Sequence, residues 1–216
     1  MPSQANLAID WRAGYGPIAH QSETIERMQT LVHRMVAQGR VADEASAHAL
    51  LAAADRVACM AMSVVAHMTY ARRIDRSGCP LGSDDFKQTP EGHTGGSLNM
   101  VPAFVGYLLA NALTGTTRGW LMGQGHCVAA IEAVNALTGD VSAAQRGRYD
   151  RSEAGLSRLI EDFYSYAIDK QGGPRYRCAA MPGLTRPARS PMAATWGSAG
   201  GSMFTLSCLE KARWYA

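Results

Sequence analysis

The sequence predicts an α/β fold that is rich in helices and ends in an irregular tail. Apolar residues recur at three- and four-residue steps in several segments, which is typical of amphipathic helices. Residues 120–137 have the pattern of a short apolar strand, a glycine turn and a helix, which is half of a βαβ unit. With 216 residues, 47% of them hydrophobic, the chain is long enough for one well-buried domain or part of a larger one.

The first predicted helices lie in the amino-terminal third of the chain. Residues 22–38 place one apolar face on a helix, made of Ile25, Met28, Leu31, Val32, Met35 and Val36. Ser22 is expected to cap its start, and Gly39 is expected to follow its end. A second helical stretch covers residues 43–54 and should continue, with a bend, to about residue 72. Its many alanines suit close helix packing.

The middle of the chain alternates between a loop and regular elements. Residues 75–97 are dense in Gly, Ser, Asp and Pro, which predicts a long loop, and loops of this length in compact domains tend to be functional. A helix is expected from residue 98 to about residue 113. Residues 120–122 form the strand candidate, and residues 127–137 form the helix after the glycine turn. Residues 152–168 predict a last amphipathic helix.

Composition excludes several classes of protein. The net charge is only +3 and no dense basic patch is visible, so we expect no nucleic-acid partner. No uninterrupted apolar run reaches about 18 residues, so we expect no membrane span. The amino terminus lacks the pattern of a secretory signal. Five irregularly spaced cysteines argue against a zinc site or a disulfide framework and favour reduced thiols in the cytoplasm.

Two histidines beside glycines are the candidate functional residues. His93 lies in PEGHTGGS, where small residues allow close backbone approach to a ligand and the start of a helix attracts anions. His126 lies in GQGH, at the end of the predicted strand, where α/β sheets commonly bind ligands. Each histidine alone is better explained as a loop or helix-capping residue. Their shared setting shifts the balance toward a binding site.

Other polar residues are assigned structural roles. His33 and His67 fall within helical patterns and should pack or lie at the surface, and His20 and His48 have no supporting context. The methionines of residues 60–68 are expected in the core. The adjacent acids Asp84–Asp85 and Glu161–Asp162 are expected at the solvated surface. No Gly-x-Ser-x-Gly elbow, Walker loop, HExxH motif or full dinucleotide fingerprint occurs.

The segments GHTGGSLNMVPAFVGYLL and WLMGQGHCVAAIEAVNAL together resemble the amino-terminal region of the thiamine-diphosphate-dependent enzymes of the transketolase and phosphoketolase group. Those enzymes have a Gly-His segment followed by small residues and a helix, and later a strand that leads into a Gly-x-Gly-His or Asn-Gly-His turn. DFKQTPEGHTGGSLN and MGQGHCVAAIEAVN are especially similar to a phosphoketolase-like branch, some of whose members are described as xylulose 5-phosphate 3-epimerases. The resemblance covers residues 58–167.

The resemblance implies a domain plan and a site. It predicts a helical region at residues 1–57, an incomplete transketolase-like diphosphate-binding domain at residues 58–171, and an irregular tail at residues 172–216. It implies thiamine diphosphate with Mg²⁺ as cofactor and a ketose phosphate, such as xylulose 5-phosphate, as substrate. The catalytic residues carried over are His93 and His126. The cofactor-binding residues carried over are Gly92, Ser97, Gly123, Gly125 and His126.

The sequence also departs from that group. No Gly-Asp-Gly-like metal-binding segment follows the matched region, and the second domain that supplies an acid to the cofactor is missing. We therefore expect a fragment that binds the cofactor weakly or not at all and is inactive alone. An epimerase-like fragment and a non-catalytic interaction remnant, with amphipathic helices forming a homodimer surface, are the alternatives. A subunit completed by a separate partner chain should retain the metal motif. Cleavage, transfer and epimerisation are not distinguished.

The tail has a different character from the rest of the chain. After residue 172 there is no Val, Ile, Asp, Asn or His, and no apolar periodicity. When each codon starts one nucleotide earlier, residues 192–199 permit Asp-Gly-Gly-Tyr-Leu-Gly-Phe-Gly and residues 202–211 permit Tyr-Val-His-Ala-Val-Leu-Pro-Gly-Glu. Both stretches match what the resemblance leads us to expect next, in one frame and in order. We interpret the tail as a frameshift product.

Overall fold

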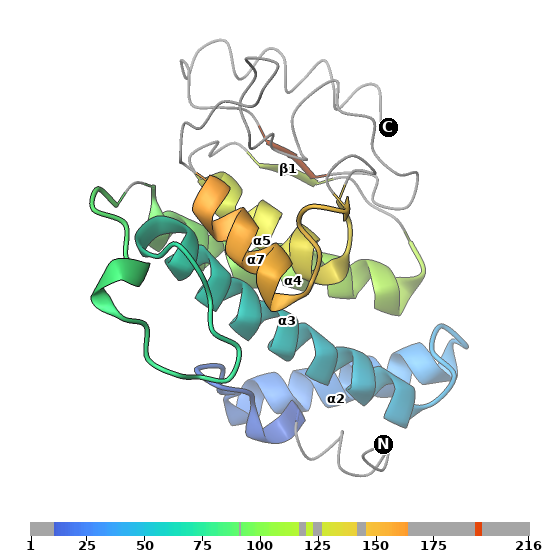
Figure 1. Ribbon diagram of the computed structural model, residues 1–216. Coiled ribbons are helices and arrows are strands. Elements are labelled where there is room, and N and C mark those ends of the chain that lie inside the picture. The colour runs from blue at the N-terminus through green and yellow to red at the C-terminus, as the bar shows by residue number, and fades with distance from the viewer. Residues whose placement is uncertain are drawn as a thin grey trace. The chain divides into compact units, whose positions relative to one another are not determined.

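The computed structural model describes residues 11–90, 92–116, 120–122, 127–141, 146–163 and 193–195 (Figure 1). The helices are α2 (Ser22–Ala37), α3 (Glu44–Tyr70), α4 (Thr94–Thr114), α5 (Val128–Thr138) and α7 (Glu153–Asp162), with the short 3-10 helix η1 (Ser83–Asp85). Two three-residue strands, β1 (Trp120–Met122) and β2 (Ala193–Thr195), pair in parallel. The predicted richness in helices is confirmed, and β1 lies where the sequence predicts a strand. Of the tail, only β2 lies within the described residues.

The chain divides into two compact units. The first contains Met1–Met60 and Pro102–Thr117, and the second contains Ala61–Val101 and Arg118–Ala216. Helices α3 and α4 therefore each contribute one part to the first unit and the other part to the second. The two units are described separately below.

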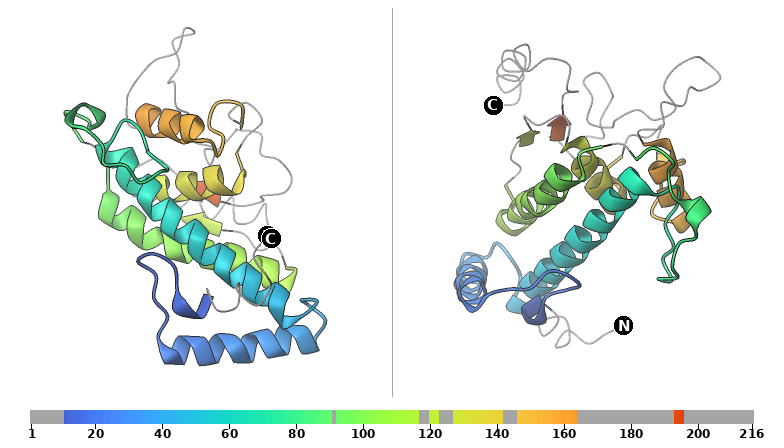
Figure 2. Two further views of the ribbon diagram at one scale, coloured as in Figure 1. Left: turned by 60° about the horizontal axis from the view of Figure 1, so that its bottom comes forward. Right: turned by 90° about the vertical axis from the view of Figure 1, so that its left-hand side faces the viewer.

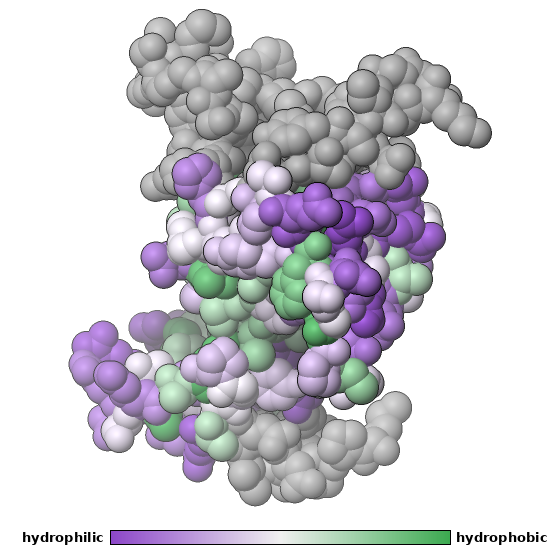
Figure 3. Space-filling view, turned by 60° about the vertical axis from the view of Figure 1, so that its left-hand side comes forward, coloured by the Kyte–Doolittle hydropathy of each residue, from purple (hydrophilic) through white to green (hydrophobic). Residues whose placement is uncertain are grey.

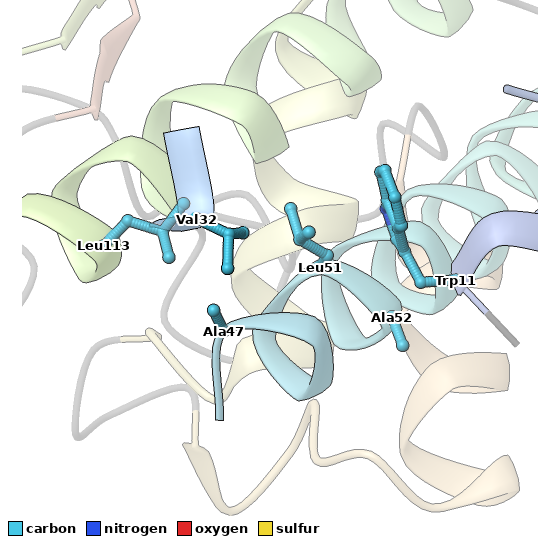
Figure 4. Close-up of a cluster of buried hydrophobic side chains, with 6 residues drawn as sticks. All are labelled: Trp11, Val32, Ala47, Leu51, Ala52 and Leu113. Atoms are coloured by element: carbon cyan, nitrogen blue, oxygen red, sulfur yellow. The ribbon is translucent and has the colours of Figure 1, made fainter. Parts of the chain in front are cut away.

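The first unit is held together by an apolar cluster. Figure 2 shows α2 beside the first turns of α3, and Figure 4 shows the side chains that fill the space between elements of this unit. The buried members are Trp11, Val32, Ala47, Leu51, Ala52 and Leu113, and Ile25, Met28, Leu31 and Val36 pack against them. The helix face that periodicity predicted for residues 22–38 is therefore the face that is buried.

The two ends of α2 differ in how well the sequence predicted them. Gly39 has a φ of +66°, and the N–H groups of Gly39 and Arg40 donate to the carbonyls of Val36 and Met35, both at 2.9 Å. This is the left-handed helix end expected of a glycine. Ser22, by contrast, is the first helical residue and not the cap. Gln21 occupies the cap position, and no side chain caps this end.

The second unit is built around buried parts of α5 and α7. All residues of α5 from Ala129 to Leu137 are buried, and α7 buries Leu156, Leu159 and Ile160. Ser152 caps α7, because its Oγ accepts a hydrogen bond from the N–H of Gly155 at 3.0 Å. The side chain of Ser157 also holds the neighbouring loop, with its Oγ 3.2 Å from the backbone N of Ile74.

Two acidic residues predicted at the solvated surface are instead paired. Asp162 is only 3% exposed, and its Oδ2 accepts hydrogen bonds from Arg148 Nε and Tyr149 Oη, both at 3.0 Å. Asp85 receives both Nε and Nη2 of Arg73, at 2.7 and 2.9 Å. The surface prediction is wrong for the buried Asp162, because its partners lie more than ten positions away in the chain. Asp85 is paired but stays partly exposed.

The second helical stretch continues as expected and forms one helix from Glu44 to Tyr70. Two other predicted helix boundaries need correction. The segment TGGS, predicted as the end of a loop, forms the first turn of α4, which starts at Thr94 and not at residue 98. Helix α7 ends at Asp162, with Phe163 in an extended conformation, so the expected continuation toward residue 168 does not occur at this point.

Helices α3 and α4 are long and apolar enough to cross a membrane by length and composition alone. The sequence prediction missed them because isolated polar residues interrupt each apolar run. Core helices of soluble proteins pass the same test, so this finding alone does not assign a membrane location. Figure 3 shows hydrophobic and hydrophilic residues interspersed on one face. The large hydrophobic residues exposed in the described part of the chain are Tyr15, Leu50, Met60, Tyr70 and Phe86.

Candidate functional site

The start of α4 carries the first candidate histidine. Gly92 has a φ of +125°, a conformation that a side chain would strain. His93 follows, with its side chain exposed, and its carbonyl accepts the backbone N–H of Ser97 at 3.0 Å. This bond makes His93 the residue that directly precedes the helix. The glycine turn therefore presents the imidazole at the helix N-terminus, as the sequence predicted.

A hydroxyl pair anchors this helix start within the second unit. Thr94 Oγ1 donates to Thr69 Oγ1 at 2.9 Å, and Thr69 lies one residue before the end of α3. Lys87 fixes the approaching loop nearby, because its Nζ donates to the carbonyls of Met68 at 2.6 Å and Phe163 at 3.0 Å. The loop before His93 is thus tied to α3 and α7, and the first turn of α4 is tied to α3.

Ser97, which the resemblance names as a cofactor-binding residue, is the buried residue of this first turn. Its side chain is fully buried, and its Oγ has no hydrogen-bond partner among the described residues. A buried hydroxyl without a partner is uncommon, because its desolvation is not compensated. Gly95, in the same turn, has open space where a Cβ would lie. The turn therefore combines the buried Ser97 hydroxyl, which lacks a hydrogen-bond partner among the described residues, with an open space beside the backbone of Gly95.

The electrostatics of the first turn favour an anion. The N–H groups that precede Ser97 have no carbonyl four residues earlier within the helix, and they carry the partial positive charge of the helix N-terminus. No acidic residue stands in the first turn of α4. A phosphate or another anion at this helix start would therefore meet backbone donors and the exposed imidazole of His93, with no carboxylate in the first turn.

The second candidate histidine lies outside the described residues. The same is true of Gly123 and Gly125, the other carried-over residues of the GQGH turn. The structure describes the elements on either side, β1 and α5. Helix α5 confirms the expected helix, and the approach of His126 to His93 stays a prediction. Cys127, at the start of α5, is buried, and this burial raises the pKa of its thiol.

Helix α5 holds two buried polar residues that the sequence analysis did not select. Glu132 is 3% exposed and Asn135 is 1% exposed. Neither polar atom of the Asn135 side chain has a partner among the described residues. The signal was present in the sequence, because IEAVN places two polar residues three positions apart in an otherwise apolar helix, on one face.

The remaining described histidines form two groups, two with surface or packing roles and two in an aromatic cluster. His33 is exposed and lies 3.1 Å from Glu44, and His67 Nδ1 lies 2.7 Å from the carbonyl of Ser63, so both have the surface or packing roles expected. His20 and His48, which had no supporting context in the sequence, both stack against Trp11 in the first unit. This cluster was missed because its members come from separate segments.

The described part of the chain holds no group of three His, Cys, Asp or Glu side chains that could bind a metal ion. Its cysteines, Cys59, Cys79 and Cys127, are free thiols. Comparisons of the whole chain with protein-family models, with curated proteins and with solved structures returned no match.

Proposed function

We propose that this chain is related to the thiamine-diphosphate-dependent enzymes that act on ketose phosphates, the transketolase and phosphoketolase group, and that the start of α4 contacts a phosphate of the cofactor or the sugar. The observation that supports the proposal most directly is the first turn of α4. It has an exposed His93 and backbone donors at the helix start, and the buried, unpartnered Ser97 hydroxyl lies in the same turn. The motif that carries the resemblance is the same segment.

Each group in this turn has a part that suits a phosphate. The imidazole of His93 can donate to a phosphate oxygen in its neutral or its charged form. The backbone N–H groups of Thr94, Gly95 and Gly96 lie at the positive end of the helix dipole. The Ser97 hydroxyl would gain the partner that it otherwise lacks. When bound, thiamine diphosphate supplies an ylid and an electron sink for attack on a ketose carbonyl.

The metal part of the cofactor site has no such support. The described residues offer no set of three ligands, so Mg²⁺ enters the proposal from the resemblance alone. Without the cation, the diphosphate loses charge-assisted contacts. We therefore propose weak cofactor binding and no turnover of xylulose 5-phosphate by this polypeptide alone. The α/β domain class and a cytoplasmic location belong to the same proposal.

Calorimetry with inorganic pyrophosphate and with thiamine diphosphate, each with and without Mg²⁺, tests the proposal. The parent chain should bind pyrophosphate in the millimolar range, as a few hydrogen bonds to an exposed anion allow. His93→Ala should weaken this binding about tenfold or more, which corresponds to the loss of one charge-assisted hydrogen bond. Ser97→Ala removes the buried hydroxyl and should also weaken it.

His67→Ala is the matched control. His67 lies on α3 and its ring contacts a carbonyl of its own helix, so pyrophosphate binding should not change. Equal losses in both histidine variants, or no effect in either, would contradict a site at the start of α4. Robust turnover of xylulose 5-phosphate by the parent chain would contradict the proposed inactivity.

A further inference from the structure

The amino-terminal segment of the first unit packs against α3 through one aromatic residue. Trp11 is 2% exposed and belongs to the apolar cluster of Figure 4. Its ring stacks on His20, with ring centroids 5.0 Å apart, and on His48, with centroids 6.1 Å apart and planes at 15°. His48 lies on α3, whereas Trp11 and His20 come from the segment that precedes α2. The segment is therefore bound to α3 by stacked rings.

The position of His48 favours the neutral imidazole over the cation. It is 6% exposed, and its Nε2 is buried without a partner among the described residues. Burial lowers its pKa from the ordinary 6.5, and the charge of Arg12 in the segment lowers it further. Glu44 on α3 raises it and His33 on α2 lowers it. Of these neighbours, Glu44 alone stabilises the protonated ring of His48.

The same segment lies against a half-buried cysteine of α3, Cys59, and covers part of it. Gly14 and Gly16 have φ values of +78° and +57°, which form a tight turn. An antiparallel backbone bridge joins Tyr15, between the two glycines, to Ile18. A Cβ added to Gly16 would lie 2.6 Å from the Sγ of Cys59, so this turn passes directly over the thiol. Release of the turn would uncover Cys59.

The far end of the segment has a contact that needs no change of protonation. His20 Nε2 lies 2.7 Å from Asp55 Oδ2, and an imidazole N–H can donate there whether the ring is neutral or charged. Acid therefore acts on the segment through His48, at the buried stack, and leaves the anchor at His20 in place.

We propose that residues 11–19, anchored at His20, form an acid-operated latch on α3, closed while His48 is neutral and released when its ring binds a proton. The buried Nε2 of His48 has no acceptor for the new N–H among the described residues, and burial of the charged ring is unfavourable. Opening supplies water, exposes Trp11 and lifts the Gly16 turn from Cys59.

The direction of the pH dependence follows from proton linkage. His48 binds a proton more readily in the open form, where its pKa returns toward the ordinary 6.5, than in the closed form. The closed form is therefore fully favoured above this value. As the pH falls below it, the ratio of open to closed form rises by up to about tenfold per pH unit, until the closed form also binds the proton.

The test compares the thiol reactivity of Cys59 and Cys79 in the full chain with a disulfide reagent that reacts in acid, quantified by mass spectrometry. Cys79 is exposed and serves as the internal reference for the reagent's own pH dependence. The ratio of Cys59 to Cys79 reactivity is measured from about pH 7.5 down to about pH 5. It should stay constant above the ordinary histidine pKa and rise several-fold to about tenfold per pH unit below it. A constant ratio over the whole range would overturn the proposal.

Two variants separate the latch from general acid effects. His48→Phe keeps an aromatic ring against Trp11 but cannot titrate, and its ratio should not rise. His33→Gln removes an exposed histidine and should leave the rise intact. An equal rise in His48→Phe would refute the role of His48. Hydrogen exchange on the parent chain gives a second measurement, because the Tyr15 and Ile18 amides should lose protection while α5 stays protected. Simultaneous loss in α5 would show global unfolding instead.

Discussion

Gly155 and Gly106 offer the same substitution with opposite expected effects. Gly155 is the third residue of α7, and a Cβ there would meet three atoms of Asp150: its Oδ1, its carbonyl oxygen at 2.5 Å and its backbone nitrogen at 2.7 Å. Two of these atoms belong to the backbone and cannot rotate away. Gly106 lies in the exposed middle of α4, with nothing within 4 Å of an added Cβ.

The magnitude follows from three contributions. Crowding of this kind costs about 1–3 kcal/mol, and displacing the Ser152 cap that holds the Gly155 N–H costs about 1 kcal/mol more. Alanine returns about 1 kcal/mol through its higher helix propensity. We therefore expect Gly155→Ala to lower the free energy of unfolding by about 1–3 kcal/mol. Gly106→Ala has only the favourable contribution and should raise it by about 0.5–1 kcal/mol.

Urea unfolding followed by circular dichroism measures both variants against the parent chain. The account requires shifts of opposite sign. Gly155→Ala that is as stable as the parent, or two shifts in the same direction, would refute the packing of Asp150 against the first turn of α7.

The remaining predictions concern the second unit and the tail. Burial raises the pKa of Tyr149 to about 12, so its ionisation, followed by absorbance, should come later than that of an ordinary tyrosine at 10, and the associated stability should be lost as the pH rises through this range. Asp162→Asn removes the anionic acceptor of Arg148 and should cost about 1–3 kcal/mol in urea unfolding; an unchanged midpoint would contradict the ion pair. An experimental structure should place His93 and His126 at a common polar crevice, and opposite faces would exclude a shared site. Gene sequencing should find the preceding frame open beyond codon 172, and early stop codons would disprove the frameshift.

Local patterns predicted the elements better than the contacts between them. The repeat of Ile25 and Val32 on one face identified α2, because burial of a helix stripe leaves a 3.6-residue period in the sequence. Gly39 marked its end for an equally local reason. The prediction for the start of α4 was wrong because the small residues of TGGS have the composition of a loop. In the structure they form the first helical turn, with a hydrogen bond from the Ser97 N–H to the His93 carbonyl.

The pairing of distant polar residues could not be predicted from the sequence. Nothing near His48 in the chain indicates that Trp11 will cover it, and nothing near Asp162 indicates Arg148. Such contacts depend on how helices pack against one another, and no periodic pattern in a single sequence indicates this packing. The place of His93 before a helix, by contrast, could be predicted because it depends on neighbouring glycines and the local backbone.

The central claim, that the start of α4 binds a phosphate group, is tested most directly by residue-level titration of the ¹⁵N-labelled chain with pyrophosphate. Concentration-dependent shifts are expected for the Thr94, Gly95, Gly96 and Ser97 amides and for the His93 ring, with the α2 amides unchanged. Shifts concentrated elsewhere in the chain, or no shift of the α4 amides at pyrophosphate concentrations well above the millimolar range, would contradict it.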